Sequence, residues 1–128
     1  MRYTLLMHYP EMTAEELGPD MLAEGMAAFS AYTKALDSAG ALVSAEVLQP
    51  SSLTTTVSLA SGELVVQDGP FADTKEQLGG IVVIDVPDLD QALEWAKQAP
   101  PAHYGVVEVR PGATHVDDGA WTTHLTYE

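Results

Sequence analysis

Residues 68–80 carry the densest set of reactive side chains in this chain, in the order DGPFADTKEQLGG. Asp68 offers a carboxylate that can accept a proton, Lys75 an ammonium that can hold an anion, and Phe71 an apolar wall. Apolar runs predicted to be strands flank the segment on both sides. Pockets for small organic ligands combine apolar walls with a few converging polar groups. The segment is therefore the first candidate for a functional site.

Asp73 and Glu76 in the same segment have two interpretations. An Asp followed three positions later by a Glu is typical of the start of a short helix, because each side chain can bond an amide of the first turn. Gly79 and Gly80 would then end that helix. The alternative is that both carboxylates bind a substrate, together with Phe71 and Lys75. A third hypothesis treats the whole of residues 68–80 as a structural corner.

Two further polar residues interrupt apolar strand patterns. His8 shares one strand face with Thr4 and Leu6, where a histidine either packs or relays protons. Glu46 interrupts the apolar run 41–49, so it lies either exposed at a rim or paired inside. With Asp68, these two residues form the set of candidate catalytic groups. Such a set suits proton transfer of the isomerase or lyase type.

Charge and composition exclude several classes of protein. The 19 acidic residues outnumber the 5 basic ones, which are scattered, so nucleic-acid binding and an anionic membrane surface are not expected. The absence of cysteine excludes disulfides and a thiolate nucleophile. His115 and His124 lack the spacing of a zinc pair. We predict no metal and no cofactor, and a cytoplasmic protein, since no signal peptide or long apolar run is present.

The elements that must position these residues follow from periodicity. The pattern predicts strands at 3–9, 41–49, 54–60, 63–67, 81–86 and 106–110, with Ser61 and Gly62 turning a hairpin. Helices are predicted from Pro19 to Gly40 and from Asp88 to Pro100. Their expected inner faces are Leu22, Met26, Phe29, Thr33 and Leu36 in the first, and Leu89, Ala92, Leu93, Ala96 and Ala99 in the second.

This order predicts an α+β fold, a ferredoxin-like split βαβ sheet with an inserted β-hairpin. Both helices would cover one sheet face. The apolar second faces of the first and fifth strands then predict a homodimer in which two sheets pack together. We expect one domain at residues 1–111. Residues 112–128 would form an extension with a turn at 117–119 and an added strand at 121–127.

The DGPF-T-K-E-Q-L-G-G motif, followed by residues 81–96, resembles the DGPF branch of the YCII-related proteins. Similarity extends to residues 3–6, 40–49 and 107–111, and so covers residues 1–111. The resemblance implies a dimeric α+β barrel of unassigned activity. Some members resemble companions of alternative sigma factors, which makes a ligand-sensing or interaction module the alternative to an enzyme. Other relatives resemble a His-Asp dyad arrangement with a histidine at the opening of the first helix, where residues 18–22 supply none. A His8–Asp68 pair is the expected substitute.

Overall fold

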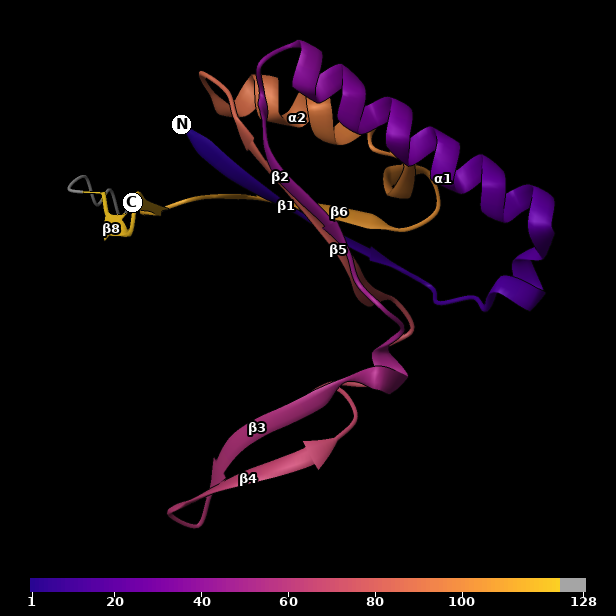
Figure 1. The fold of residues 1–128 in the computed structure, drawn as a ribbon, viewed down its shortest axis with the longest axis vertical. Coiled ribbons are helices and arrows are strands. Elements are labelled where there is room, and N and C mark those ends of the chain that lie inside the picture. Colours follow the sequence, from indigo (N-terminus) through magenta and orange to yellow (C-terminus); the bar gives the residue numbers. More distant parts are fainter. Residues whose placement is uncertain (123–128) are drawn as a thin grey trace.

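The computed structural model describes residues 1–122, which form a four-stranded antiparallel sheet with two helices on one face (Figure 1). The sheet strands are β1 (Arg2–Tyr9), β2 (Leu42–Val47), β5 (Gln77–Asp85) and β6 (Val106–Pro111), in the order β2-β5-β1-β6. Helix α1 (Ala14–Ser38) connects β1 to β2, and α2 (Leu89–Gln98) connects β5 to β6. This is the predicted ferredoxin-like split βαβ arrangement, with β1 and β5 in the centre.

The core lies between the sheet and the helices. Along β1 the buried side chains are Tyr3, Leu5 and Met7, which alternate with partly buried Thr4, Leu6 and His8 as the strand period of two requires. On β5 the matching buried positions are Val82 and Ile84. The other core members come mainly from the helices and their ends: Tyr32, Leu36, Ala41, Val86, Ala92, Ala96 and Ala99.

Helix α1 begins at Ala14, before the predicted start at Pro19, with a capping box in which Glu16 N donates to Thr13 Oγ1 at 3.0 Å. The helix is interrupted at Gly18 (φ 80°), directly before Pro19. Only its second half packs on the sheet, since Tyr32 and Leu36 are buried while Met26 is 68% exposed. The expected inner face was therefore wrong at Leu22 and Met26, and Tyr32 was missed. The first half of α1 extends beyond the sheet, so its apolar side chains have no core to pack against (Figure 1).

Helix α2 is short and relies on alanine for close packing. Asp88 caps it by accepting a hydrogen bond from Gln91 N at 2.9 Å, as predicted. Ala92, Ala96 and Ala99 are buried, whereas Leu89 and Leu93 remain exposed. The two helices are joined by the Tyr32 hydroxyl, which donates to the backbone oxygen of Trp95 at 2.7 Å. A short 3₁₀ turn, η2 (Pro100–His103), follows α2 and leads into β6.

A β-hairpin extends from the end of the sheet, away from both helices (Figure 1). It follows the 3₁₀ turn η1 (Ser51–Leu53) and consists of β3 (Thr55–Ala60) and β4 (Glu63–Asp68). The predicted two-residue turn is confirmed, with φ of 52° at Ser61 and 83° at Gly62. One face carries two cross-strand pairs, Val57 with Val66 and Leu59 with Leu64. We call these four residues the hairpin apolar face; they are 62–75% exposed.

The sheet face opposite the helices is only partly buried within one chain. It carries Thr4, Leu6 and His8 from β1, with Ile81 and Val83 from β5. The predicted apolar second face is thus present on the two central strands. No helix of residues 1–122 is long and apolar enough to cross a membrane.

After β6 the chain forms a small ribbon of β7 (Val116–Asp117) and β8 (Ala120–Trp121), which pair antiparallel. The predicted turn is present, with positive φ at Asp118 and Gly119. Of the strand expected at 121–127, residues 123–127 lie outside the described part of the chain.

Candidate functional site

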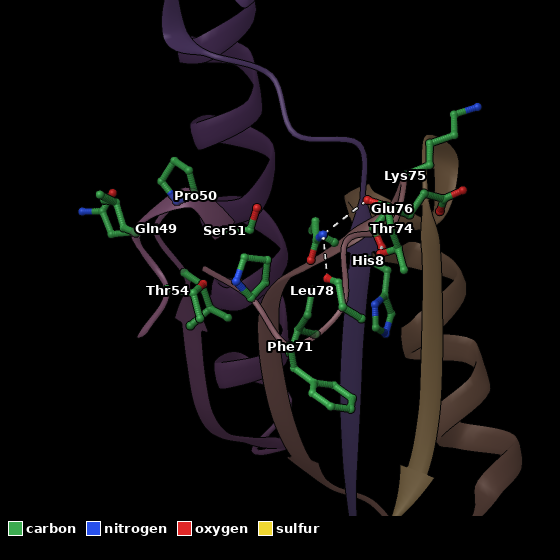
Figure 2. Close-up of a pocket in the computed structure, with 15 residues that line it drawn as sticks. His8, Gln49, Pro50, Ser51, Thr54, Phe71, Thr74, Lys75, Glu76 and Leu78 are labelled. Carbon is green, nitrogen blue, oxygen red and sulfur yellow. Dashed lines mark hydrogen bonds between the residues drawn. The ribbon is translucent and has the colours of Figure 1, made fainter. Parts of the chain in front are cut away.

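An open pocket of about 850 Å³ lies where the hairpin joins the sheet (Figure 2). His8 contributes from the end of β1. The other walls come from two segments, one entering the hairpin (48–54) and one leaving it (70–78). Site residues were predicted from the sequence in the second segment but not in the first. The signal was available, because the two ends of a hairpin must lie side by side.

The base of the hairpin is fixed by local hydrogen bonds. Gly69 N donates to Thr54 O at 2.7 Å, and Thr56 Oγ1 donates to Gly69 O at 2.6 Å. A positive φ of 102° makes glycine the favoured residue at position 69. These bonds hold the two chain segments that form the pocket walls together.

The segment from Phe71 to Glu76 is an irregular turn, so the expected helix beginning at Asp73 was wrong. Its backbone carbonyls accept hydrogen bonds from side chains instead of from the backbone amides of a helix. Gln77 Nε2 donates to Ala72 O at 3.2 Å and to Thr74 O at 3.3 Å, and Thr74 Oγ1 donates to Glu76 O at 2.8 Å. The Gln77 side chain therefore holds this turn in its conformation.

Gly79 and Gly80 are part of β5 and do not end a helix. The β1–β5 register shifts between Met7 and His8, which leaves Gly79 as an unpaired bulge residue. A Cβ at Gly79 would collide with the Tyr9 ring. Bulges are common beside functional sites because they redirect neighbouring side chains. Here the bulge lies directly beside His8 and Leu78, both of which line the pocket.

His8 pairs with a carboxylate that the sequence analysis overlooked. Its Nε2 lies 2.6 Å from Oε1 of Glu108 on β6, although the contact lacks hydrogen-bond geometry and Nε2 has no hydrogen-bond partner among residues 1–122. The alternation of β6 puts Val107 and Val109 on the core side and Glu108 on the side of His8. Strand order, which the sequence implied, was the signal that would have found Glu108.

Four of the seven predicted site residues meet in the pocket: His8, Phe71, Lys75 and Glu76. Phe71 is 94% exposed. Lys75 extends away from the His8 ring (Figure 2) and forms no ion pair within residues 1–122. Glu76 is partly buried, and its Oε2 is buried without a hydrogen-bond partner in the described part of the chain.

The other three lie outside the pocket lining. Asp68 is exposed at the end of β4, opposite Thr55. Glu46 is exposed on the edge strand β2, opposite Ile81 and separated from β1 by β5. Asp73 is exposed on the turn, between two residues that do line the pocket. The expected His8–Asp68 pair is replaced by the His8–Glu108 contact.

Tyr9 follows His8 in the sequence, but its side chain packs against the core and does not line the pocket. Tyr9 and Tyr104 pack edge to face, with ring centroids 5.8 Å apart. Burial raises the pKa of Tyr9, and the neighbouring Tyr104 and Glu11 raise it further. Burial also raises the pKa of Tyr104. Both hydroxyls therefore stay protonated near neutral pH and can donate hydrogen bonds but do not serve as bases.

No group of three or more His, Asp or Glu side chains within residues 1–122 is arranged to hold a metal ion. What the site does present is a histidine with a nearby carboxylate at one end of an apolar pocket. A pair of this kind can accept a proton and return it.

Comparison with known proteins gives two findings. A family model described as "YCII-related domain" matches residues 1–123. An uncharacterized protein of Rhizobium meliloti (strain 1021) is 35% identical over 117 residues, which cover 90% of this chain and 94% of that protein. The match spans the sheet, the hairpin and the pocket. The chain thus belongs to the family of YCII-related domain proteins.

Proposed function

We propose that the pocket binds a small organic molecule and that His8 exchanges a proton with it, in chemistry of the isomerase or lyase type. The observation that carries this proposal is the position of His8. Its side chain lines the pocket, and its buried Nε2 faces the Glu108 carboxylate at 2.6 Å, which leaves Nδ1 as the ring nitrogen available to a ligand.

Glu108 takes the role of a positioning residue in this proposal. A carboxylate beside an imidazole favours one ring orientation and stabilises the imidazolium that forms when the ring accepts a proton. Phe71, Leu48 and Leu78 supply apolar walls that hold the organic part of the ligand.

The working unit we propose is a homodimer. Support comes from two apolar surfaces that a single chain does not cover. One is the face of the central strands opposite the helices, and the other is the hairpin apolar face. Contiguous exposed apolar patches of this kind are rare on monomers and mark interfaces. A two-stranded hairpin is also marginally stable by itself, so contact with a second copy would stabilise it.

A second candidate function, a non-catalytic module that senses a ligand or binds a protein, is favoured by one observation. Phe71 is 94% exposed and shares the pocket rim with exposed Lys75. An aromatic ring in that position suits a contact with another protein. A link to an alternative sigma factor is supported by the family resemblance alone.

A turnover screen separates the two candidates. Purified protein is incubated with a broad metabolite mixture, and the mixture is compared by mass spectrometry with one incubated with His8→Asn. Conversion of a compound by the wild type, lost in His8→Asn and kept in the control Asp68→Asn, which does not line the pocket, supports the enzyme. A compound that binds and is recovered unchanged from wild type contradicts catalysis and supports the sensing module.

A further inference from the structure

Two buried side-chain polar atoms within residues 1–122 lack a hydrogen-bond partner, and both belong to residues that line the pocket. They are Nε2 of His8 and Oε2 of Glu76. A buried polar atom without a partner loses its hydration with no compensating bond, which is why such atoms are rare. Nε2 of His8 already faces the Glu108 carboxylate at 2.6 Å, whereas Oε2 of Glu76 has no comparable contact among the described residues, which indicates a polar group arranged for a bound partner. Glu76 then restricts what that partner can be.

An ionised carboxylate only accepts hydrogen bonds, so the group that complements Glu76 must be an N–H or O–H donor. The neighbouring cation does not meet this need, because Lys75 points away (Figure 2) and makes no ion pair in the part of the chain described. A protonated amine complements a carboxylate better than a neutral hydroxyl does, since charge-assisted hydrogen bonds are the stronger kind.

The net charge of the chain and the other walls of the pocket also favour a protonated amine as the ligand. The chain carries a formal net charge of −14, which repels anions and attracts cations at long range. The rest of the pocket is largely apolar, with Leu48, Leu53 and Phe71 among its walls. A ligand that matches all of these features has one cationic end and an apolar or aromatic body.

We infer that the pocket takes a primary or secondary amine in its protonated form, with the ammonium on Glu76 and the apolar body against Phe71 and Leu48. This inference rests on the proposed function and adds the ligand class. It also reverses the role that the sequence suggested for Lys75, which was to hold an anion. Because Oε2 is buried while the Glu76 side chain as a whole is partly exposed, the proposed contact requires the carboxylate to rotate towards the ligand.

Three probes of similar shape test the ligand class: phenethylamine, phenethyl alcohol and hydrocinnamate, which carry a cationic, a neutral and an anionic end. Each is titrated into isotope-labelled protein while the amide signals of residues 71–78 and the His8 ring signals are followed by NMR. Phenethylamine is expected to shift these signals, with an affinity at least about tenfold higher than that of hydrocinnamate. Equal or tighter binding of hydrocinnamate overturns the inference.

Glu76→Gln and a matched control identify the group that binds the amine. Asp73→Asn removes the same charge from the same turn, but residue 73 does not line the pocket. We expect phenethylamine affinity to fall about tenfold or more in Glu76→Gln and less than about twofold in Asp73→Asn. Equal losses in both variants overturn the inference. If Glu76→Gln unfolds, the ranking of the three probes on wild type decides.

The outcomes also separate this inference from the function on which it rests. If hydrocinnamate or a component of a metabolite mixture shifts the pocket signals and phenethylamine does not, the pocket is real and the amine class is wrong. If no compound shifts them, both the pocket's function and its ligand class are contradicted.

Discussion

The imidazole of His8 lies against the carboxylate of Glu108, with 2.6 Å between Nε2 and Oε1, across the adjacent strands β1 and β6. The two residues are 100 positions apart in the sequence, and the antiparallel register brings them onto the same sheet face. Both are held by rigid strands, whereas the opposite wall of the pocket is an irregular turn. The part of the candidate site held by regular strands is thus the His8–Glu108 pair, and the irregular part is the segment from Phe71 to Glu76.

Glu108→Gln should release the His8 ring from this orientation. We expect the ring signals of His8 in NMR spectra to shift and broaden, and any His8-dependent turnover to fall. The free energy of unfolding should change by less than about 1 kcal/mol, because Glu108 is 61% exposed and solvent screens the pair. Glu46→Gln is the matched control, since Glu46 is exposed on another strand of the sheet. Identical spectral changes in the two variants would contradict the assigned role of Glu108.

Leu64→Lys tests whether the hairpin apolar face is part of a homodimer contact. Leu64 is 75% exposed in one chain, so a buried charge would arise only in an assembly. We expect the wild type to sediment as a dimer, and the variant to weaken the dimer by at least about tenfold without unfolding the monomer.

Met26→Lys provides the comparison for Leu64→Lys, because Met26 is 68% exposed on the distant α1 helix. It should leave the sedimentation profile unchanged. A wild-type protein that remains a monomer at micromolar concentration would refute the homodimer.

Gly79→Ala should distort the site through Tyr9. The added methyl group would collide with the Tyr9 ring, which forces either the ring or the bulge to move. Overpacking of this kind costs about 1–3 kcal/mol, measurable by urea unfolding. Gly25→Ala, inside α1 with open space around its Cβ, should instead stabilise the protein by about 0.5–1 kcal/mol. If the two substitutions changed the free energy of unfolding equally, the Tyr9 ring would not lie as close to Gly79 as the structure places it.

The stability of the protein should fall at high pH because of Tyr32. Burial raises its pKa from 10.0 to about 12, which means that the folded state keeps a proton that the unfolded state loses. The resulting stabilisation is complete below pH 10 and is lost as the pH rises through about 12. Urea unfolding at several alkaline pH values measures the loss.

Tyr32→Phe should remove this pH dependence and also cost about 1 kcal/mol at neutral pH, because the hydrogen bond to Trp95 O disappears. If Tyr32→Phe still lost stability at alkaline pH to the same extent as the wild type, another titrating group would be responsible for the loss.

Strand alternation and helix caps were enough to predict the sheet, both helices and the hairpin turn. The pattern of β1 placed His8 on the correct face, since a strand's period of two leaves only two choices. The start of α2 at Asp88 was correctly predicted because the capping bond is local. The family itself was evident from the motif at 68–80, and the model match over residues 1–123 confirms it.

The failures came from relationships that only the assembled fold defines. Leu22 and Met26 have helical spacing, yet α1 runs beyond the sheet and leaves Met26 exposed. Gly79 and Gly80 were interpreted as a helix end because glycine is common both at helix ends and where two segments pack closely. The Tyr9 ring beside Gly79 and the Glu46 carbonyl beside Gly80 show that close packing is the reason here. Glu108 was passed over since its significance depends on a strand pairing far away in sequence.

The most direct test of a ligand site beside His8 is a crystal soaked in a broad metabolite mixture. The account predicts ligand density between His8 and the segment from Phe71 to Glu76, with a polar group of the ligand within hydrogen-bonding distance of Glu76. Density at another place on the molecule, or a pocket filled by the side chains of a second subunit in every crystal, would contradict it.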